Sequence, residues 1–285
     1  MPRIPNQYRA ERLSLIKTMK RLIKSYQPQL LPASQASKKV IIFDLDGVLC
    51  TTNTWQACNI IGWKTIFHYI VDQWKFPSQL FLYKALADTP AKSKIRSFAA
   101  DRIVMPAIMV DWQCNLQSPE TIKAVMIKHI NSSRYSAAQK DFLLKVIELK
   151  MNPERLIASR RAIKTGVKLI HELKDLGYKL YVISNWDFQS FPLLKKQFPK
   201  IFIHDGKKMF DGIMTSGQAK IAKPYHTIYE QTLSEFNINP QEAIFIDDVI
   251  ENIHAAEKLG IQSIHCVKKN MYSVATTLAK ILKQV

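Results

Sequence analysis

The sequence has little of what marks disulfide-rich, zinc-binding, secreted and membrane proteins. It carries four cysteines in 285 residues, and no two of them form a CxxC pair. A disulfide framework or a zinc site is therefore not expected, and a reducing compartment fits better. No apolar run reaches the roughly 18 residues that a transmembrane helix needs, and the N-terminal residues lack the apolar centre of a signal peptide. We expect a soluble, cytoplasmic protein.

Acidic residues are also scarce, since 41 lysines and arginines stand against 23 aspartates and glutamates, a net charge of +18. Residues 1–38 hold eight basic side chains and one acidic one, and residues 50–160 hold fifteen against eight. Such a balance favours an anionic partner, although solvated surface charge would also explain it. No nucleic-acid-binding module is visible, so we do not expect a nucleic-acid partner.

Residues 1–38 have the pattern of a basic leader followed by a linker. Within residues 10–24, apolar side chains recur at helical spacing between arginines and lysines, which predicts a basic amphipathic helix. Such a helix can lie on an anionic membrane surface, or it can pack on its own domain with its lysines reaching solvent. Both readings stay open, and peripheral membrane association through residues 10–24 is one of them. Pro28 and Pro32 mark the linker.

The most informative stretch is Val40–Phe43, an unbroken apolar run followed directly by Asp44-Leu45-Asp46-Gly47. Such a run predicts a strand that is buried on both faces, in the middle of a parallel sheet. In open α/β sheets the site lies just beyond the carboxyl ends of the strands. Asp44 and Asp46 therefore fall where chemistry is expected. Cys50 has no evident base beside it and is interpreted as a small buried hydrophobe.

Three further features follow in order along the chain. Lys179–Ile183 predicts a strand that ends at Ser184-Asn185, and Glu242–Ile246 predicts another that ends at Asp247-Asp248. Between them lies Lys223-Pro224. Alone, these features are a common turn, a helix cap and a surface lysine. Two adjacent buried carboxylates, however, repel each other and need a cation to offset the repulsion.

Together the four features resemble the motifs of the haloacid dehalogenase-like (HAD) phosphohydrolase superfamily, and the resemblance covers Val40–Val267. It implies an α/β fold with a Rossmann-like three-layer α/β/α core, a parallel sheet and an inserted all-helical cap of the C1 type. The core would comprise residues 39–50 and 160–285, and the cap residues 51–159. We expect the tryptophans of this insert in its core. Its helical patterns are Ile60–Trp74, Pro77–Ala87, Thr89–Val110, Pro119–Ile130 and Ser136–Lys150.

The resemblance also implies roles for single residues. Asp44 would be the nucleophile that forms an aspartyl-phosphate, and Asp46 the general acid and base. Mg²⁺ would be the cofactor, since hard oxygen ligands suit it. Its ligands would be Asp44, Asp46 through its backbone carbonyl, and Asp248, with Asp247 acting through water. The phosphoryl oxygens would be held by the Ser184 hydroxyl, by the backbone N–H groups of Leu45 and Asn185, and by the charge of Lys223.

The resemblance thus implies a Mg²⁺-dependent phosphatase that hydrolyses a phosphate monoester. The presence of Asp46 argues against a dehalogenase, because the dehalogenases of the superfamily lack this acid and need no metal. One alternative is a phosphomutase or a phosphotyrosine protein phosphatase. Another is a basic membrane- or nucleic-acid-binding protein with a vestigial hydrolase site. The substrate would be a phosphorylated small molecule or a phosphoprotein, and the basic cap suggests a second anionic group on it.

Overall fold

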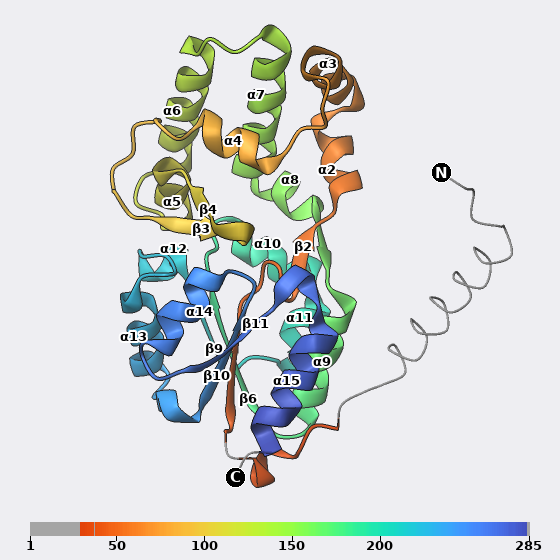
Figure 1. The fold of residues 1–285 in the computed structure, drawn as a ribbon, viewed down its shortest axis with the longest axis vertical. Helices are drawn as coiled ribbons and strands as arrows, with labels where there is room; N and C mark the ends of the chain where they lie inside the picture. Colours follow the sequence, from red (N-terminus) through yellow and green to blue (C-terminus); the bar gives the residue numbers. More distant parts are fainter. Residues whose placement is uncertain (1–28, 37, 284–285) are drawn as a thin grey trace, which may run out of the picture.

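The computed structural model describes residues 29–36 and 38–283 (Figure 1). The basic helix predicted over residues 10–24 lies outside this part of the chain. None of the helices within it combines the length and the apolar character needed to cross a membrane.

A five-stranded parallel sheet forms the centre of the fold, in the order β11-β10-β1-β6-β9. Strand β1 lies between β10 and β6, because Val40 is the register partner of both Ala243 and Lys179. All four residues of β1 are buried, as their unbroken apolar run predicts. The strands of the sheet are β1 (Val40–Phe43), β6 (Lys179–Ser184), β9 (Gly212–Thr215), β10 (Ala243–Asp247) and β11 (Gln262–His265).

Helices cover both faces of this sheet, which confirms the predicted three-layer α/β fold (Figure 1). Ile41 and Phe43 pack toward one layer, while Val40 and Ile42 pack toward the other, since successive side chains of a strand alternate. The first layer contains α9 (Lys164–Asp175), α10 (Ser190–Gln197), α11 (Pro199–Phe202) and α15 (Met271–Lys283), and the second α13 (His226–Glu235) and α14 (Ile250–Glu257). Shorter elements are β7 (Ile203–His204), β8 (Lys207–Lys208) and α12 (Ser216–Ala219).

The long insert leaves the core through β2 (Cys50–Thr52) and returns through β5 (Arg160–Ala162), and these two strands pair antiparallel. It lies over the carboxyl edge of the sheet and has an apolar core of its own (Figure 1). Its helices are α2 (Thr54–Ile61), α3 (Trp63–Gln73), α4 (Gln79–Ala85), α5 (Ala107–Gln113), α6 (Pro119–Ser132), α7 (Ala137–Met151) and α8 (Pro153–Ala158).

The insert is helical apart from one hairpin, so the helix predicted over Thr89–Val110 is wrong for most of its length. Strands β3 (Ser97–Ala99) and β4 (Ile103–Met105) pair antiparallel there, and helix α5 begins only at Ala107. Asp101 turns the chain with a φ of 63°. The β-branched residues of β4 favour an extended backbone over a helix.

The helix predicted over Ile60–Trp74 is interrupted at Gly62, whose φ is 97°, and the expected burial of the insert's tryptophans is mostly wrong. Trp112 is buried, but Trp63 and Trp74 are 44% and 91% exposed. Helix α3 buries the face that carries Tyr69 and turns its other apolar face to solvent. The sequence shows two apolar faces on this helix, and only one of them packs.

Candidate active site

The loop after β1 holds Asp44 and Asp46 in a tight turn at the carboxyl edge of the sheet. The Asp44 N–H donates to the Ile246 carbonyl at 2.9 Å, which continues the pairing of β1 with β10 beyond the strand. Gly47 has a φ of 83°, and a Cβ at this position would lie 2.0 Å from the Asp248 carboxylate. Only glycine therefore allows the turn to pass so close to Asp248.

Lys223 connects two carboxylates from neighbouring strands. Its Nζ lies 2.9 Å from Asp44 Oδ1 and 2.6 Å from Asp247 Oδ2, and it also donates to the Ile183 carbonyl at 2.9 Å. The side chain is 1% exposed. Burial alone would lower the pKa of Lys223, but Asp247 and Asp44 raise it above its ordinary value, so the amine stays charged.

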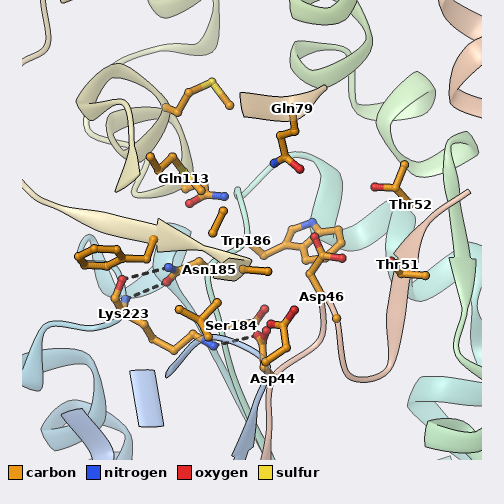
Figure 2. A pocket seen from close by; sticks show the side chains of 18 of the residues that line it. Asp44, Asp46, Thr51, Thr52, Gln79, Gln113, Ser184, Asn185, Trp186 and Lys223 are labelled. Atoms are coloured by element: carbon orange, nitrogen blue, oxygen red, sulfur yellow. Dashed lines mark hydrogen bonds and ion pairs between the residues drawn. The ribbon is translucent and has the colours of Figure 1, made fainter. Parts of the chain in front are cut away.

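The last residue of β6, Ser184, and the first residue after it, Asn185, lie beside this lysine (Figure 2). The Asn185 Oδ1 accepts the Lys223 N–H at 2.8 Å, and its Nδ2 donates to the Lys223 carbonyl and to Ser97 Oγ on the hairpin. Asn185 therefore ties the Lys223 loop to the insert. The Ser184 hydroxyl is buried and has no hydrogen-bond partner among the described residues, which leaves it free to donate to a bound group.

The two aspartates at the end of β10 differ in their bonding. Asp247 is fully buried, and both of its oxygens accept hydrogen bonds: Oδ1 from the Val249 N–H, Oδ2 from Lys223 Nζ, and both from Asn252 Nδ2. The Asp248 carboxylate has no such partner in the described chain. Burial, together with Asp247, Asp44 and Asp46, raises the pKa of Asp248 to about 9. This is the residue whose charge most needs a cation.

The carboxylates at this edge fit a hard divalent cation. Asp44, Asp247 and Asp248 each offer an oxygen, and these three oxygens lie within 4.8 Å of one another. Burial raises the pKa of Asp44 to about 6, although Lys223 opposes that rise. Because one lysine cannot neutralise three carboxylates, a cation with oxygen ligands would relieve the remaining repulsion.

Replacing Asp248 with asparagine is expected to stabilise the metal-free protein and to remove its response to Mg²⁺. The pKa of Asp248 is higher in the folded protein than its ordinary value of 3.8. Its charge therefore opposes folding increasingly as pH rises from about 4 to about 9, and asparagine removes that effect. At pH 8 without metal we expect a Tm at least ~2 °C above wild type. Saturating Mg²⁺, which adds about 2.7 kcal/mol at 100 times the Kd, should stabilise only the wild type.

Thermal melts with EDTA and with Mg²⁺ measure both effects. Asp88→Asn is the matched control, because Asp88 is exposed and should leave both melts unchanged. If the Asp248→Asn variant shows the same Mg²⁺-induced rise in Tm as the wild type, the prediction that Asp248 binds Mg²⁺ is contradicted.

Asp46 points toward the insert in Figure 2. It is held there by Arg160, which no sequence pattern had indicated. Arg160 Nη1 lies 2.9 Å from both Asp46 oxygens, and the guanidinium carbon lies 5.3 Å from the centroid of the Trp186 ring. Arg160 belongs to β5, 114 positions from its partner. Its position in the sequence could have indicated this contact, because the strand by which the insert rejoins the core pairs with the strand that follows the turn at residues 44–47.

A cavity of about 300 Å³ opens between the sheet edge and the insert. The predicted residues Asp44, Asp46, Ser184, Asn185, Lys223 and Asp248 line it. Asp247 and Leu45 are fully buried, and neither lines the cavity. The side chains that the insert contributes were not predicted, and they include Gln79, Tyr83, Trp112, Gln113 and Lys150.

The haloacid dehalogenase-like hydrolase family matches residues 38–260 of the chain. A sesquiterpene phosphatase from Aspergillus oryzae is 32% identical over 97 residues, which are 34% of this chain and 46% of that protein. A glyceraldehyde 3-phosphate phosphatase from Pyrococcus abyssi is 26% identical over 136 residues, 44% of this chain and 55% of that one. The chain thus spans about half the length of these curated relatives.

Two solved structures share the fold. A HAD-like hydrolase from Porphyromonas gingivalis superposes with a TM-score of 0.52 at 18% identity, covering 88% of this chain and all of that one. A variant HAD-family enzyme from Bacteroides thetaiotaomicron was solved with magnesium and inorganic phosphate. It superposes with a TM-score of 0.51 at 18% identity, and the match covers 80% of this chain and 94% of that one. With the family match over most of its length, this chain belongs to the haloacid dehalogenase-like hydrolases.

Proposed function

We propose that this chain is a Mg²⁺-dependent phosphatase that hydrolyses a phosphate monoester through an aspartyl-phosphate on Asp44. The observation that carries this proposal is the group of Asp44, Asp247 and Asp248 around the buried Lys223, at the carboxyl edge of the sheet. The phosphatase names of two relatives support it. The magnesium and phosphate in a structure of the same fold agree with it.

In the first step, an Asp44 carboxylate oxygen attacks phosphorus while the ester oxygen leaves. For this step Asp46 leaves its pair with Arg160, takes up a proton from solvent and gives that proton to the ester oxygen. In the second step, Asp46 takes a proton from water, and the water oxygen attacks the phosphorus and releases Asp44. Lys223 holds Asp44 in place through both steps. Its positive charge stabilises the negative charge that develops around phosphorus in each transition state.

The phosphoryl oxygens would be bound by the Ser184 hydroxyl and by the backbone N–H groups of Leu45 and Asn185. The free Ser184 Oγ supports this assignment. Asp44, Asp248 and the Asp46 carbonyl would hold Mg²⁺, with Asp247 acting through water because its oxygens already accept other hydrogen bonds. When bound, Mg²⁺ would supply positive charge beside the phosphoryl oxygens.

A small-molecule substrate fits better than a phosphoprotein. The cavity has about 300 Å³ and is covered by the insert, whereas a folded protein would need an open approach to Asp44. The two phosphatase relatives are named after small molecules.

Hydrolysis of para-nitrophenyl phosphate with Mg²⁺ and with EDTA tests the proposal. We expect turnover with Mg²⁺, loss of turnover in EDTA, and recovery when Mg²⁺ is added back, because uncompensated carboxylates would repel the phosphate. Turnover that is insensitive to EDTA would refute the metal requirement. A folded protein that hydrolyses neither this ester nor any of a panel of small phosphate esters would refute the phosphatase.

A further inference from the structure

Building on the proposed phosphatase function, we propose that Lys150 and Arg160 form a second anion-binding position in the same cavity. The substrate would then be a phosphate ester that carries another anionic group, either a carboxylate or a second phosphate. Asp44 would attack the phosphoryl group that is cleaved, and Ser184 and Lys223 would help to hold that group. Lys150 and Arg160, on the side of the insert, would hold the other anion.

Lys150 is the first observation behind this proposal. It lies in the last turn of α7, is partly buried and lines the cavity. Its Nζ makes no hydrogen bond or ion pair within the described part of the chain. The other two lysines that line the cavity do have partners, because Lys223 binds two carboxylates and Lys269 donates to Thr51 Oγ1 at 2.6 Å. Burial and the nearby Arg160 lower the pKa of Lys150 to about 8, so an anion beside it would be favourable.

Arg160 is the second observation, because only part of its guanidinium is used. Its Nη1 binds Asp46 and Thr52, while its Nε is buried without a partner among the described residues. A guanidinium carries five N–H donors in a planar fork, which suits two oxygens of one carboxylate or phosphate. The ring of Trp186 lies against it and restricts its orientation. An anion in the cavity could therefore bind the donors that Asp46 leaves free.

The charge balance links this position to the reaction. The Asp46 carboxylate balances the positive charge of Arg160, and both of its oxygens accept hydrogen bonds from the same nitrogen, Nη1. When Asp46 leaves Arg160 and takes up the proton that it gives to the leaving oxygen, Arg160 and Lys150 lose this negative charge. A second anion on the substrate would replace it and release Asp46 for proton transfer. The second anion should therefore raise kcat as well as lower KM, since it contributes to the step that needs Asp46.

Three esters of similar size test the proposal: glycerol 3-phosphate, 3-phosphoglycerate and glycerol 1,3-bisphosphate. The first carries no second anion, the second adds a carboxylate, and the third adds a phosphate. With the wild type we expect kcat/KM to be at least ~10-fold higher for one or both of the esters with a second anion than for glycerol 3-phosphate, as one charge-assisted hydrogen bond provides. Which of the two is preferred identifies the anion.

The variant Lys150→Met should reduce that preference to about threefold or less, measured as the ratio of kcat/KM between the esters with and without a second anion for that same variant. Lys150→Arg should restore part of the preference, because it restores the charge. Lys145→Met is the matched control, since Lys145 lies on the same helix and is exposed; it should leave all rates unchanged. Thermal shifts of the Asp44→Asn protein with the three esters, with and without Lys150→Met, report binding without turnover.

The outcomes separate the two proposals. If para-nitrophenyl phosphate is hydrolysed with Mg²⁺ but glycerol 3-phosphate is used as well as both esters with a second anion, the second anion position is refuted and the phosphatase stands. The same holds if Lys150→Met leaves the preference unchanged. If no phosphate ester is hydrolysed, the phosphatase fails. The thermal shifts then still decide whether Lys150 helps to bind the esters with a second anion more tightly than glycerol 3-phosphate.

Discussion

Replacing Asp44 with asparagine is expected to reduce the Mg²⁺-dependent hydrolysis of para-nitrophenyl phosphate by at least ~10³-fold, the scale on which the loss of a nucleophile acts. The amide oxygen cannot attack phosphorus as a carboxylate does. The substitution also removes one of the three carboxylates that would surround the metal. Steady-state rates at saturating Mg²⁺ measure the loss.

The fold should survive this substitution. Asparagine has nearly the shape of aspartate, and Lys223 keeps its 2.6 Å contact with Asp247. Asp88→Asn makes the same chemical change at an exposed position and should retain full activity. An Asp44→Asn protein that melts like wild type and still hydrolyses the ester within ~10-fold of the wild-type rate would exclude Asp44 as the nucleophile.

Replacing Lys223 with methionine is expected to lower the free energy of unfolding by about 3–5 kcal/mol in the absence of metal. The side chain is 1% exposed and compensates both Asp44 and Asp247. Methionine fills a similar volume but leaves two buried carboxylates facing each other without a cation. The midpoint of urea unfolding, monitored by fluorescence and circular dichroism, measures the loss.

Lys196→Met is the control for this experiment, because Lys196 is exposed on α10 and should change the stability by less than ~0.5 kcal/mol. The double variant Lys223→Met with Asp247→Asn should regain part of the loss, since it removes one of the two uncompensated charges. If Lys223→Met costs no more than the control, the ion pairs do not stabilise the fold. If the double variant is worse than the single one, charge repulsion is not the cause of the loss.

The centre of the fold could be predicted because it depends on local patterns. Unbroken apolar runs identify β1, β6 and β10, and these are neighbours in the sheet. Polar residues at the ends of neighbouring parallel strands must lie close together. Asp44, Ser184 and Asp248 therefore line the same cavity, as their positions along the sequence imply.

The rest of the site depends on contacts that no local pattern encodes. Lys150 is one of fourteen lysines and arginines in residues 51–159, and only the packing of α7 over the sheet edge brings it into the cavity. The pair of Arg160 with Asp46 joins residues 114 positions apart. The hairpin at Ser97–Met105 was missed because its apolar spacing also fits a helix, and the choice between the two is made by tertiary packing.

The attachment of the insert bears on how such a protein can diversify. The insert leaves and rejoins the core through two paired strands, in which Cys50 lies opposite Ala162. Opposed Cα atoms in such strands are about 4.5–5.5 Å apart, a gap that a two-residue turn can close. Residues 53–159 could therefore be shortened, lengthened or exchanged without displacing the sheet. Substitutions in the insert would then change the lining of the cavity while the sheet that positions Asp44 and Lys223 stays the same.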